Sequence, residues 1–383
     1  MSARQVVKRL LAAGYITVCL AVSLVLTACT SSPAASRDAA PHDAASVPGN
    51  ENVYVIRPNH YRDSAFIEHL GSGLAVLERT ELSYAGLENA WGVPAVSKGI
   101  VYVVAQGVEG ARDARLVIGF DPITGEMHEY PVNHPALKSV AATDQYLFVT
   151  SVINNVSTIT RVDKDSAKTL DAVFTGDFLV GITACGNRLA VLRQPGFDFS
   201  GDAELLILDE NMELLETRAL TGLGSANSMT LVAEDMLCFG THREDAASPT
   251  HYRNALNLYS PATGEMRTIA ESDYRYGFAA VDEACLIVLQ SEANVADGNR
   301  IAVFDLVTGE PRSQTVTDYL PQYLLVEDGL LYVAGFDRAQ GDYCLQCYRI
   351  DEGSLSLLTE TRLGSAGLPA DDYGIGGLFA AAD

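Results

Sequence analysis

Short runs of apolar residues recur along this chain at a regular interval, and each run follows a polar turn. The seven runs are Val53–Ile56, Val101–Val104, Tyr146–Val149, Leu189–Leu192, Met236–Phe239, Leu286–Leu289 and Leu331–Ala334. From Val53 to Leu331 the interval averages about 46 residues, close to the length of a four-stranded propeller blade. Short apolar runs bounded by Gly, Asp and Asn are typical of strands. The pattern therefore predicts a repeat of small β-sheets rather than two or three separate domains.

A second apolar strand follows each run after a polar loop. These strands are Ala65–Leu70, Leu116–Phe120, Thr158–Val162, Leu205–Leu208, Leu256–Tyr259, Ile301–Phe304 and Cys347–Ile350. They are mostly apolar on both faces, as expected of sheets covered on both sides by neighbouring sheets. Turns that end in Thr-Gly-Glu follow three of them, and we expect Gly125, Gly264 and Gly309 there to adopt the left-handed conformation.

A further strand precedes each repeat, at 94–97, 139–142, 182–185, 230–233, 279–282 and 323–326, and the chain ends on one at 377–383. The folded part instead begins on a second strand, at Val53. We expect three strands from the front and one from the back to complete a single blade, which closes a ring without an open sheet edge. The prediction is an all-β, seven-bladed β-propeller over residues 52–383. Two unrelated β-sandwiches, the alternative, would not explain the complementary ends.

The Thr-Gly-Glu turns begin at Asp121, Ser260 and Asp305. They resemble the quinoprotein-like (PQQ-type) propeller repeats of many exported proteins, including lipoprotein scaffolds of outer-membrane assembly. The resemblance covers most of the chain after its leader and implies the propeller fold. Those repeats usually carry a Trp after the turn and form eight blades, whereas the single Trp here is Trp91, outside that position. We therefore transfer the fold from the resemblance and expect no cofactor.

The N-terminus has the features of an export signal. Arg4, Lys8 and Arg9 precede the almost wholly apolar stretch Leu10–Leu26, which closes with Thr27, Ala28 and Cys29. This segment resembles the lipobox of bacterial lipoproteins, in which the Cys thiol is lipidated and the preceding peptide is removed. The resemblance implies a signal peptide at residues 1–28, lipid such as palmitate on Cys29, and anchoring outside the cytoplasm, on the cell membrane or on an outer membrane. An uncleaved transmembrane helix is the alternative.

Residues 29–51 are small, polar and Pro-containing, and we expect them to form a flexible tether. The chain contains 49 Asp and Glu against 26 Lys and Arg, which gives a net charge of −23. Loss of the three leader cations makes the mature chain more acidic still. Because such a field repels phosphate backbones, we expect no nucleic-acid partner.

Loop lengths predict two unlike faces of the ring, one with tight turns and one with long loops and between-blade connections. In propellers the long loops usually form the binding surface. The tripeptide His-Tyr-Arg occurs on this face in the first and fifth blades, and the hypothesis is that its two copies face each other across the channel. The candidate ligand-binding residues are His60, Tyr61, Arg62, Trp91, Arg243, His251, Tyr252, Arg253, Arg275, Tyr276, Arg338 and Tyr373.

The arginines of this set, joined by Arg57, would gather positive charge suited to a carboxylate or sulfate ligand. The alternative is that these side chains only pack on blade edges and pair with surface acids. Five cysteines remain after Cys19 and Cys29, so at least one is free or paired between chains. Cys344 and Cys347 lie three residues apart on one strand, roughly 10 Å, which is too far for a disulfide without a bend.

The acidic stretches 198–204 and 371–372 lack the pattern of a Ca²⁺ loop, and we expect no metal site. The sequence contains no phosphate loop, nucleophile elbow or zinc-protease motif. The first functional hypothesis is therefore a binding or scaffold module for a protein, peptide or glycan at the cell envelope. The second is an extracytoplasmic lyase or hydrolase of acidic glycans that uses His60, His251, Tyr252 and the arginines. The direction of the His-Tyr-Arg side chains discriminates between the two hypotheses: an enzyme requires that they point toward a common point, whereas side chains splayed on the rim favour the binding module.

Overall fold

The computed structural model describes residues 52–90, 92–199, 201–245, 248–291, 299–366 and 373–381, without the side chains of residues 244–252 and 365–366. The leader, Cys29, the tether and Trp91 lie outside the described residues. None of the described helices is long and apolar enough to cross a membrane.

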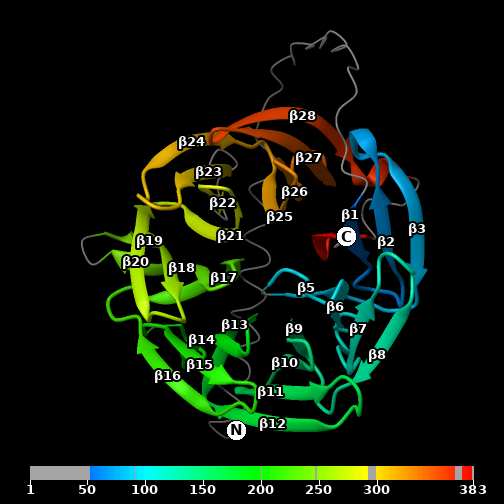
Figure 1. The fold of residues 1–383 in the computed structure, drawn as a ribbon, viewed down its shortest axis with the longest axis vertical. Coiled ribbons are helices and arrows are strands. Elements are labelled where there is room, and N and C mark those ends of the chain that lie inside the picture. Colours follow the sequence, from blue (N-terminus) through cyan, green and yellow to red (C-terminus); the bar gives the residue numbers. More distant parts are fainter. Residues whose placement is uncertain are drawn as a thin grey trace, which may run out of the picture. The chain divides into compact units, whose positions relative to one another are not determined.

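The described chain forms seven antiparallel sheets arranged as the blades of a propeller (Figure 1). The first blade contains β29 (Gly377–Ala380), β1 (Val53–Pro58), β2 (Ala65–Leu70) and β3 (Val76–Leu82). The second contains β4 (Leu87–Glu88), β5 (Ala95–Ser97), β6 (Ile100–Ala105), β7 (Leu116–Phe120) and β8 (Met127–Pro131). The third contains β9 (Leu137–Ala142), β10 (Tyr146–Ile153), β11 (Val156–Asp163) and β12 (Thr169–Thr175).

The fourth blade contains β13 (Asp177–Cys185), β14 (Arg188–Pro195), β15 (Glu204–Asp209) and β16 (Leu214–Ala219). The fifth contains β17 (Ser225–Ala233), β18 (Met236–Asp245), β19 (Ser248–Ser260) and β20 (Glu265–Ser272). The sixth contains β21 (Arg275–Asp282), β22 (Cys285–Ser291), β23 (Arg300–Asp305) and β24 (Pro311–Val316). The seventh contains β25 (Leu320–Glu327), β26 (Leu330–Asp337), β27 (Asp342–Asp351) and β28 (Ser354–Arg362). The short 3-10 helices are η1 (Ser72–Leu74) and η3 (Leu363–Ala366).

Closure of the ring confirms the prediction made from the two chain ends. β1 pairs antiparallel with β29, with Val53 opposite Ala380 and Ile56 opposite Gly377. Arg57, which is fully buried, fastens the same seam because its guanidinium donates hydrogen bonds to the carbonyls of Gly374 at 2.8 Å and of Leu363 and Tyr373 at 3.2 Å. Residues more than 300 positions apart are thereby joined.

The hydrophobic core of the described chain is divided among the interfaces between blades. Val53 and Val55 pack toward the seventh blade, whereas Tyr54 and Ile56 pack toward the second. The same alternation along the other blades gives one apolar cluster at each interface between neighbours. This arrangement explains why the strands are apolar on both faces.

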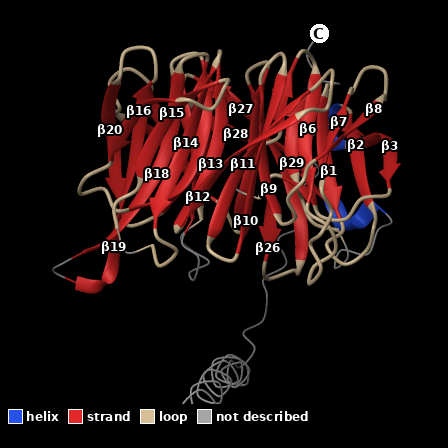
Figure 2. Ribbon diagram, turned by 90° about the horizontal axis from the view of Figure 1, so that it is seen from below, coloured by secondary structure: helices blue, strands red, loops and turns tan. Residues whose placement is uncertain are grey.

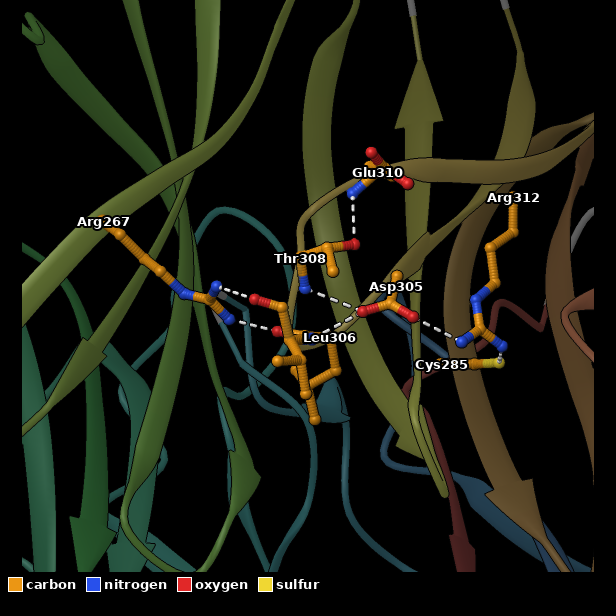
Figure 3. Close-up of polar contacts among 8 residues, drawn as sticks. Arg267, Cys285, Asp305, Leu306, Thr308, Glu310 and Arg312 are labelled. Atoms are coloured by element: carbon orange, nitrogen blue, oxygen red, sulfur yellow. Dashed lines mark hydrogen bonds and ion pairs between the residues drawn. The ribbon is translucent and has the colours of Figure 1, made fainter.

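The Thr-Gly-Glu turns owe their shape to side chains of the motif itself. Asp305 accepts hydrogen bonds from the backbone N–H groups of Val307 and Thr308, and the Thr308 hydroxyl accepts one from Glu310 N (Figure 3). Gly309 has a φ of 77°, and Gly125 and Gly264 are likewise left-handed, as predicted. The motif is therefore a self-capped turn.

Side chains of one blade bind the turn carbonyls of the next. Arg267 of the fifth blade donates to the carbonyls of Leu306 and Val307 in the sixth (Figure 3). Equivalent bonds run from Tyr54 to Pro122, from Arg161 to Glu210, from Arg188 to Pro261 and from Ser313 to Gly353. These bonds join the outer turns of the second, fourth, fifth, sixth and seventh blades to the preceding blade.

The order of the strands gives the ring two different faces, and Figure 2 shows the ring from the side. The turns between first and second strands and between third and fourth strands share the short-turn face. The connections between second and third strands and between blades share the opposite face, which we call the long-loop face. Because β1 is a second strand, the described chain starts on the short-turn face.

We expect Arg57→Met to lower the free energy of unfolding by about 3–5 kcal/mol, since it leaves three buried carbonyls without their donor and leaves the buried Glu68 carboxylate with Arg79 as its one arginine partner. Urea denaturation of the purified protein measures the change. Arg115→Met is the matched control because Arg115 is exposed, and it should change stability by no more than about 0.5 kcal/mol. A loss below about 1 kcal/mol for Arg57→Met would contradict a fastening role at the seam.

Candidate functional site

The loop that carries His60 is held in one conformation by Asn59. This residue is fully buried, and its side-chain oxygen accepts hydrogen bonds from Tyr61 N at 2.8 Å and Arg62 N at 3.1 Å. The His60 carbonyl accepts a bond from Glu109 N in the neighbouring blade. The imidazole is therefore presented on a rigid loop of the long-loop face.

His60 faces the Glu88 carboxylate, with 3.8 Å between His60 Nε2 and Glu88 Oε2. Next to them Gly374 leaves space, because a Cβ built there would lie 3.4 Å from the Tyr343 hydroxyl and 3.6 Å from His60 Nε2. Arg112 and Lys138 act on Glu88 through their charges. We call these five residues, His60, Glu88, Arg112, Lys138 and Tyr343, the Glu88 cluster.

Burial sets the proton affinities in the Glu88 cluster. It raises the pKa of the Glu88 carboxyl, and the positive charges of His60, Arg112 and Lys138 offset part of that rise. Burial, followed by the charge of Arg112, lowers the pKa of Lys138. Burial also raises the pKa of Tyr343. Groups of opposite charge are therefore each pushed toward neutrality.

The inner strand of the second blade is interrupted where it carries Glu88. β4 ends at Glu88 and β5 begins at Ala95. Within the interruption Asn89 donates a side-chain hydrogen bond to Val93 O at 2.8 Å, and Ala90 N donates to Lys138 O at 2.7 Å. The irregular segment thus fixes Glu88 beside the first residues of β9.

A pocket of about 460 Å³ opens on the same face over the fourth to seventh blades. Its walls include aromatic side chains from two blades, Phe178 and Phe199 from the fourth and Tyr276 and Phe278 from the sixth. Val180, Leu289 and Pro321 add apolar surface, whereas Asn227, His242, Arg275 and Gln322 supply polar groups. We call it the aromatic pocket. Its size lies in the range of small-ligand sites.

His242 is the titratable group whose pKa the pocket changes most. Burial first, and then the charge of Arg275, lowers the pKa of His242 to about 4. The imidazole is therefore neutral near pH 7. Phe278 of the pocket wall stacks on Tyr323, with ring centroids 5.8 Å apart.

The structure brings some of the predicted residues together. Arg275 and Tyr276 line the aromatic pocket, although Tyr276 is almost fully buried. Arg243 and Arg253 are cross-strand neighbours on β18 and β19, and Arg243 donates to Gly222 O at 2.6 Å. Whether these residues bind a ligand stays a prediction.

Other predicted residues lie elsewhere. Arg338 is exposed in the turn after β26. Tyr373 is 9% exposed, with its ring against Phe66 and its hydroxyl 3.0 Å from Ser64 Oγ. Arg57 does not add charge to the face, because it is buried under the seam.

The two His-Tyr-Arg tripeptides do not share a local structure. His60–Arg62 lies in a loop, with Tyr61 65% exposed, whereas His251–Arg253 lies within β19. The side chains of His251 and Tyr252 lie outside the described ones, as does Trp91. Recurrence of the tripeptide is therefore not recurrence of one structural unit.

The cysteines of the described chain are free and buried. Cys344 packs toward the sixth blade and Cys347 toward the first, on opposite faces of β27. Burial raises the pKa of Cys344 to about 12 and of Cys347 to about 11, so both thiols stay protonated. The described residues include no group of acidic, His or Cys side chains placed to hold a metal ion.

Glu88, Arg112, Lys138, His242 and Tyr343 were not among the sequence candidates. Glu88 is the second residue of β4 and Lys138 is the second residue of β9, so each lies near the start of the inner strand of its blade. A search for charges at those starts would have found both.

No family model matches this chain, and no curated protein matches it. Solved structures do resemble it. The dihydro-heme d1 dehydrogenase NirN, in complex with DHE, has a TM-score of 0.53 at 10% identity, over 86% of this chain and 75% of that chain. A Bacteroides fragilis protein provisionally described as a 6-phosphogluconolactonase has a TM-score of 0.59 at 12% identity, over 86% and 98%.

BamB from Moraxella catarrhalis has a TM-score of 0.47 at 14% identity, over 80% of this chain and 87% of that chain. At such identities the likeness shows the fold alone. The β-propeller fold is shared by proteins of different activities and does not by itself select a function.

We expect His242 to make the protein less stable as the pH falls from about 6.5 to about 4. In that window the imidazole binds a proton in the unfolded chain and not in the folded chain. This difference lowers the free energy of unfolding by about 1–2 kcal/mol after solvent screening. Urea denaturation between pH 7 and pH 4.5 measures the slope, and His242→Gln should flatten it. His128→Gln, which removes a histidine whose side chain is 40% exposed, is the matched control. Equal slopes for wild type and His242→Gln would show that the pocket does not perturb this imidazole.

Proposed function

We propose that this protein is a lipid-anchored, extracytoplasmic binding module that takes up an apolar side chain of a peptide or protein segment at the cell envelope. The observation that supports the proposal is the aromatic pocket. Its walls come from four blades whose strands are packed on both sides, so the pocket is preformed. Preformed apolar pockets with a few polar groups are the usual sites for a ligand anchor.

The lining favours a peptide over a glycan. Phe178, Phe199 and Phe278 offer apolar ring faces, and Val180, Leu289 and Pro321 offer no hydrogen-bonding side chain. A sugar hydroxyl placed against this apolar part of the lining would lose its hydrogen bonds to water, which costs about 1–3 kcal/mol for each buried group without a partner. An apolar side chain gains its burial there.

One observation favours the second candidate, an enzyme on acidic glycans. His60 and Glu88 form a half-buried acid–base pair beside two cations, and such pairs serve proton transfer in active sites. This pair lies outside the aromatic pocket. Formation of product from oligogalacturonate would support the enzyme over the binding module.

The anchor is tested by substitution of Cys29. We expect wild type to incorporate labelled palmitate and to remain with the membrane fraction, because two or more acyl chains hold a protein stably. Cys29→Ala should lose the label, and Cys19→Ala should keep it as the matched control. Undiminished label in Cys29→Ala would overturn the lipidation.

Pocket binding is tested with N-acetylated tetrapeptides that contain one Phe among alanines. We expect thermal shift and calorimetry to detect binding, and Phe199→Ala to weaken it about 10-fold through the loss of one aromatic contact. Phe199 is 40% exposed, so its removal costs the fold little. Ile123→Ala, at a 71% exposed position on the short-turn face, is the matched control. Binding of oligogalacturonate but of no peptide would overturn the proposal in favour of a glycan ligand.

A further inference from the structure

The inner strands of five successive blades are irregular at an equivalent place. Each of β9, β13, β17, β21 and β25, which lie around the centre of the ring in Figure 1, leaves out of its ladder with the second strand one or two residues between its second and fourth positions. The residues left out of the ladder are Lys138, Val180, Asn227, Gly277 with Phe278, and Gln322. Such a β-bulge turns its extra side chain out of the regular alternation of the strand.

The aromatic pocket opens over four of these bulges. Its lining includes every one of these bulged residues in the fourth to seventh blades, namely Val180, Asn227, Gly277, Phe278 and Gln322. Bulges are common beside binding sites because they aim a side chain that a regular strand would direct elsewhere. The pocket is therefore made by a repeated irregularity of the blades rather than by loops alone.

Contacts between blades hold these bulges in place. The Ser228 hydroxyl of the fifth blade donates to Tyr276 O at 3.2 Å and lies 2.9 Å from Gly277 O, so it binds the backbone at the bulge of the sixth blade. Beside the bulge of the seventh blade, a Cβ added to Gly335 would collide with Leu320 O, so the strands approach there more closely than a side chain allows. The bulged residues therefore stand on a rigid base.

Two of the bulged residues carry amide groups with an unsatisfied end. Asn227 Nδ2 and Gln322 Oε1 are both buried, and neither has a hydrogen-bond partner among the described residues. The first atom is a donor and the second an acceptor. Burial of a polar atom without a partner is costly, so a ligand that satisfies both atoms gains affinity. Because the terminal torsion of an amide side chain has a broad minimum, each amide can turn toward the pocket that it lines at small cost.

The two amides stand on either side of the blade that supplies Phe278. Asn227 belongs to β17 of the fifth blade and Gln322 to β25 of the seventh, and β21 of the sixth blade lies between them. A side chain that packs on the Phe278 ring therefore lies between a hydrogen-bond donor and an acceptor.

We propose that Asn227 and Gln322 bind the main chain of the peptide residue whose apolar side chain enters the aromatic pocket. The carbonyl of that residue accepts a hydrogen bond from Asn227 Nδ2, and its N–H donates one to Gln322 Oε1. The inference rests on the proposed function for the identity of the ligand. It makes the pocket selective for an apolar residue within an extended peptide segment over a free apolar molecule.

The chemistry of a peptide residue fits this pair. Each residue other than Pro offers one carbonyl and one N–H, and in an extended chain the two groups of one residue point to the same side. The bulged residues of the pocket are uncharged, so a charged ligand group would lose water there without gaining an ion pair from them. A neutral main chain carries no such cost.

The experiment compares an N-acetylated tetrapeptide, with Phe second among alanines, with two analogues. In the first analogue an ester oxygen replaces the N–H of Phe. In the second a carbon–carbon double bond replaces the peptide bond after Phe and so removes the Phe carbonyl. Wild type should bind each analogue about 5-fold more weakly than the peptide, because each lacks one hydrogen bond. Calorimetry measures the affinities.

Two variants assign the hydrogen bonds to their side chains. Gln322→Met should weaken binding of the peptide about 5-fold and leave binding of the ester unchanged, since the ester has no N–H to lose. Asn227→Leu should likewise weaken the peptide and leave the alkene unchanged. Unchanged binding of one analogue also shows that the variant is folded. Gln340→Met, at an exposed position in the turn after β26, is the matched control and should bind all three as wild type does.

The outcomes separate the main-chain site from the pocket. Equal wild-type affinity for peptide, ester and alkene, lowered in Phe199→Ala, would overturn the main-chain site and leave the pocket. Weaker peptide binding in Asn227→Leu and Gln322→Met without any effect of Phe199→Ala would support the main-chain site and overturn the pocket as the anchor. Binding of N,N′-diacetylchitobiose, in place of peptides, that needs Asn227 and Gln322 would overturn the peptide as the source of the amide.

Discussion

The antiparallel pairing of β1 with β29 is the interaction on which the rest of the structure depends. Each blade is apolar on both faces, so the first and the seventh blade each keep one uncovered apolar face until the ring is complete. Arg57 fastens the join with backbone carbonyls from the end of the chain. Because His60 and Tyr343 lie on opposite sides of this seam, closure also assembles the Glu88 cluster.

Much of the fold was predictable from the sequence because its signals are local and repeated. The apolar runs, the Thr-Gly-Glu turns and the complementary ends fixed seven blades and the shared first blade, and all of these are confirmed. Thr308 and Asp305 cap their own turn, so the motif carries its structure with it. The division of the inner strand at Asn89 was not predictable, because a hydrogen bond to another blade, at Lys138, holds it.

The candidate site was less accessible to sequence reasoning. Its members lie at positions 60, 88, 112, 138 and 343, far apart in the sequence, and come from the first, second, third and seventh blades. The sequence prediction put Arg57 on the ligand-binding face because of its residue type. Its guanidinium instead donates hydrogen bonds to three buried carbonyls, which accept them as an anionic ligand would. Burial, which decides between these roles, is a property of the closed ring.

Five neighbouring pairs of blades are joined by side chains that donate to main-chain carbonyls in the outer turns, at Pro122, Glu210, Pro261, Leu306 and Gly353. A carbonyl is present whatever residue occupies the position, so the turn sequences are free to diverge while the donors keep their acceptors. Mutational drift on the short-turn face therefore leaves the spacing of the blades intact. The blades that position both sites therefore keep their arrangement when residues change on the short-turn face, the surface farthest from these sites.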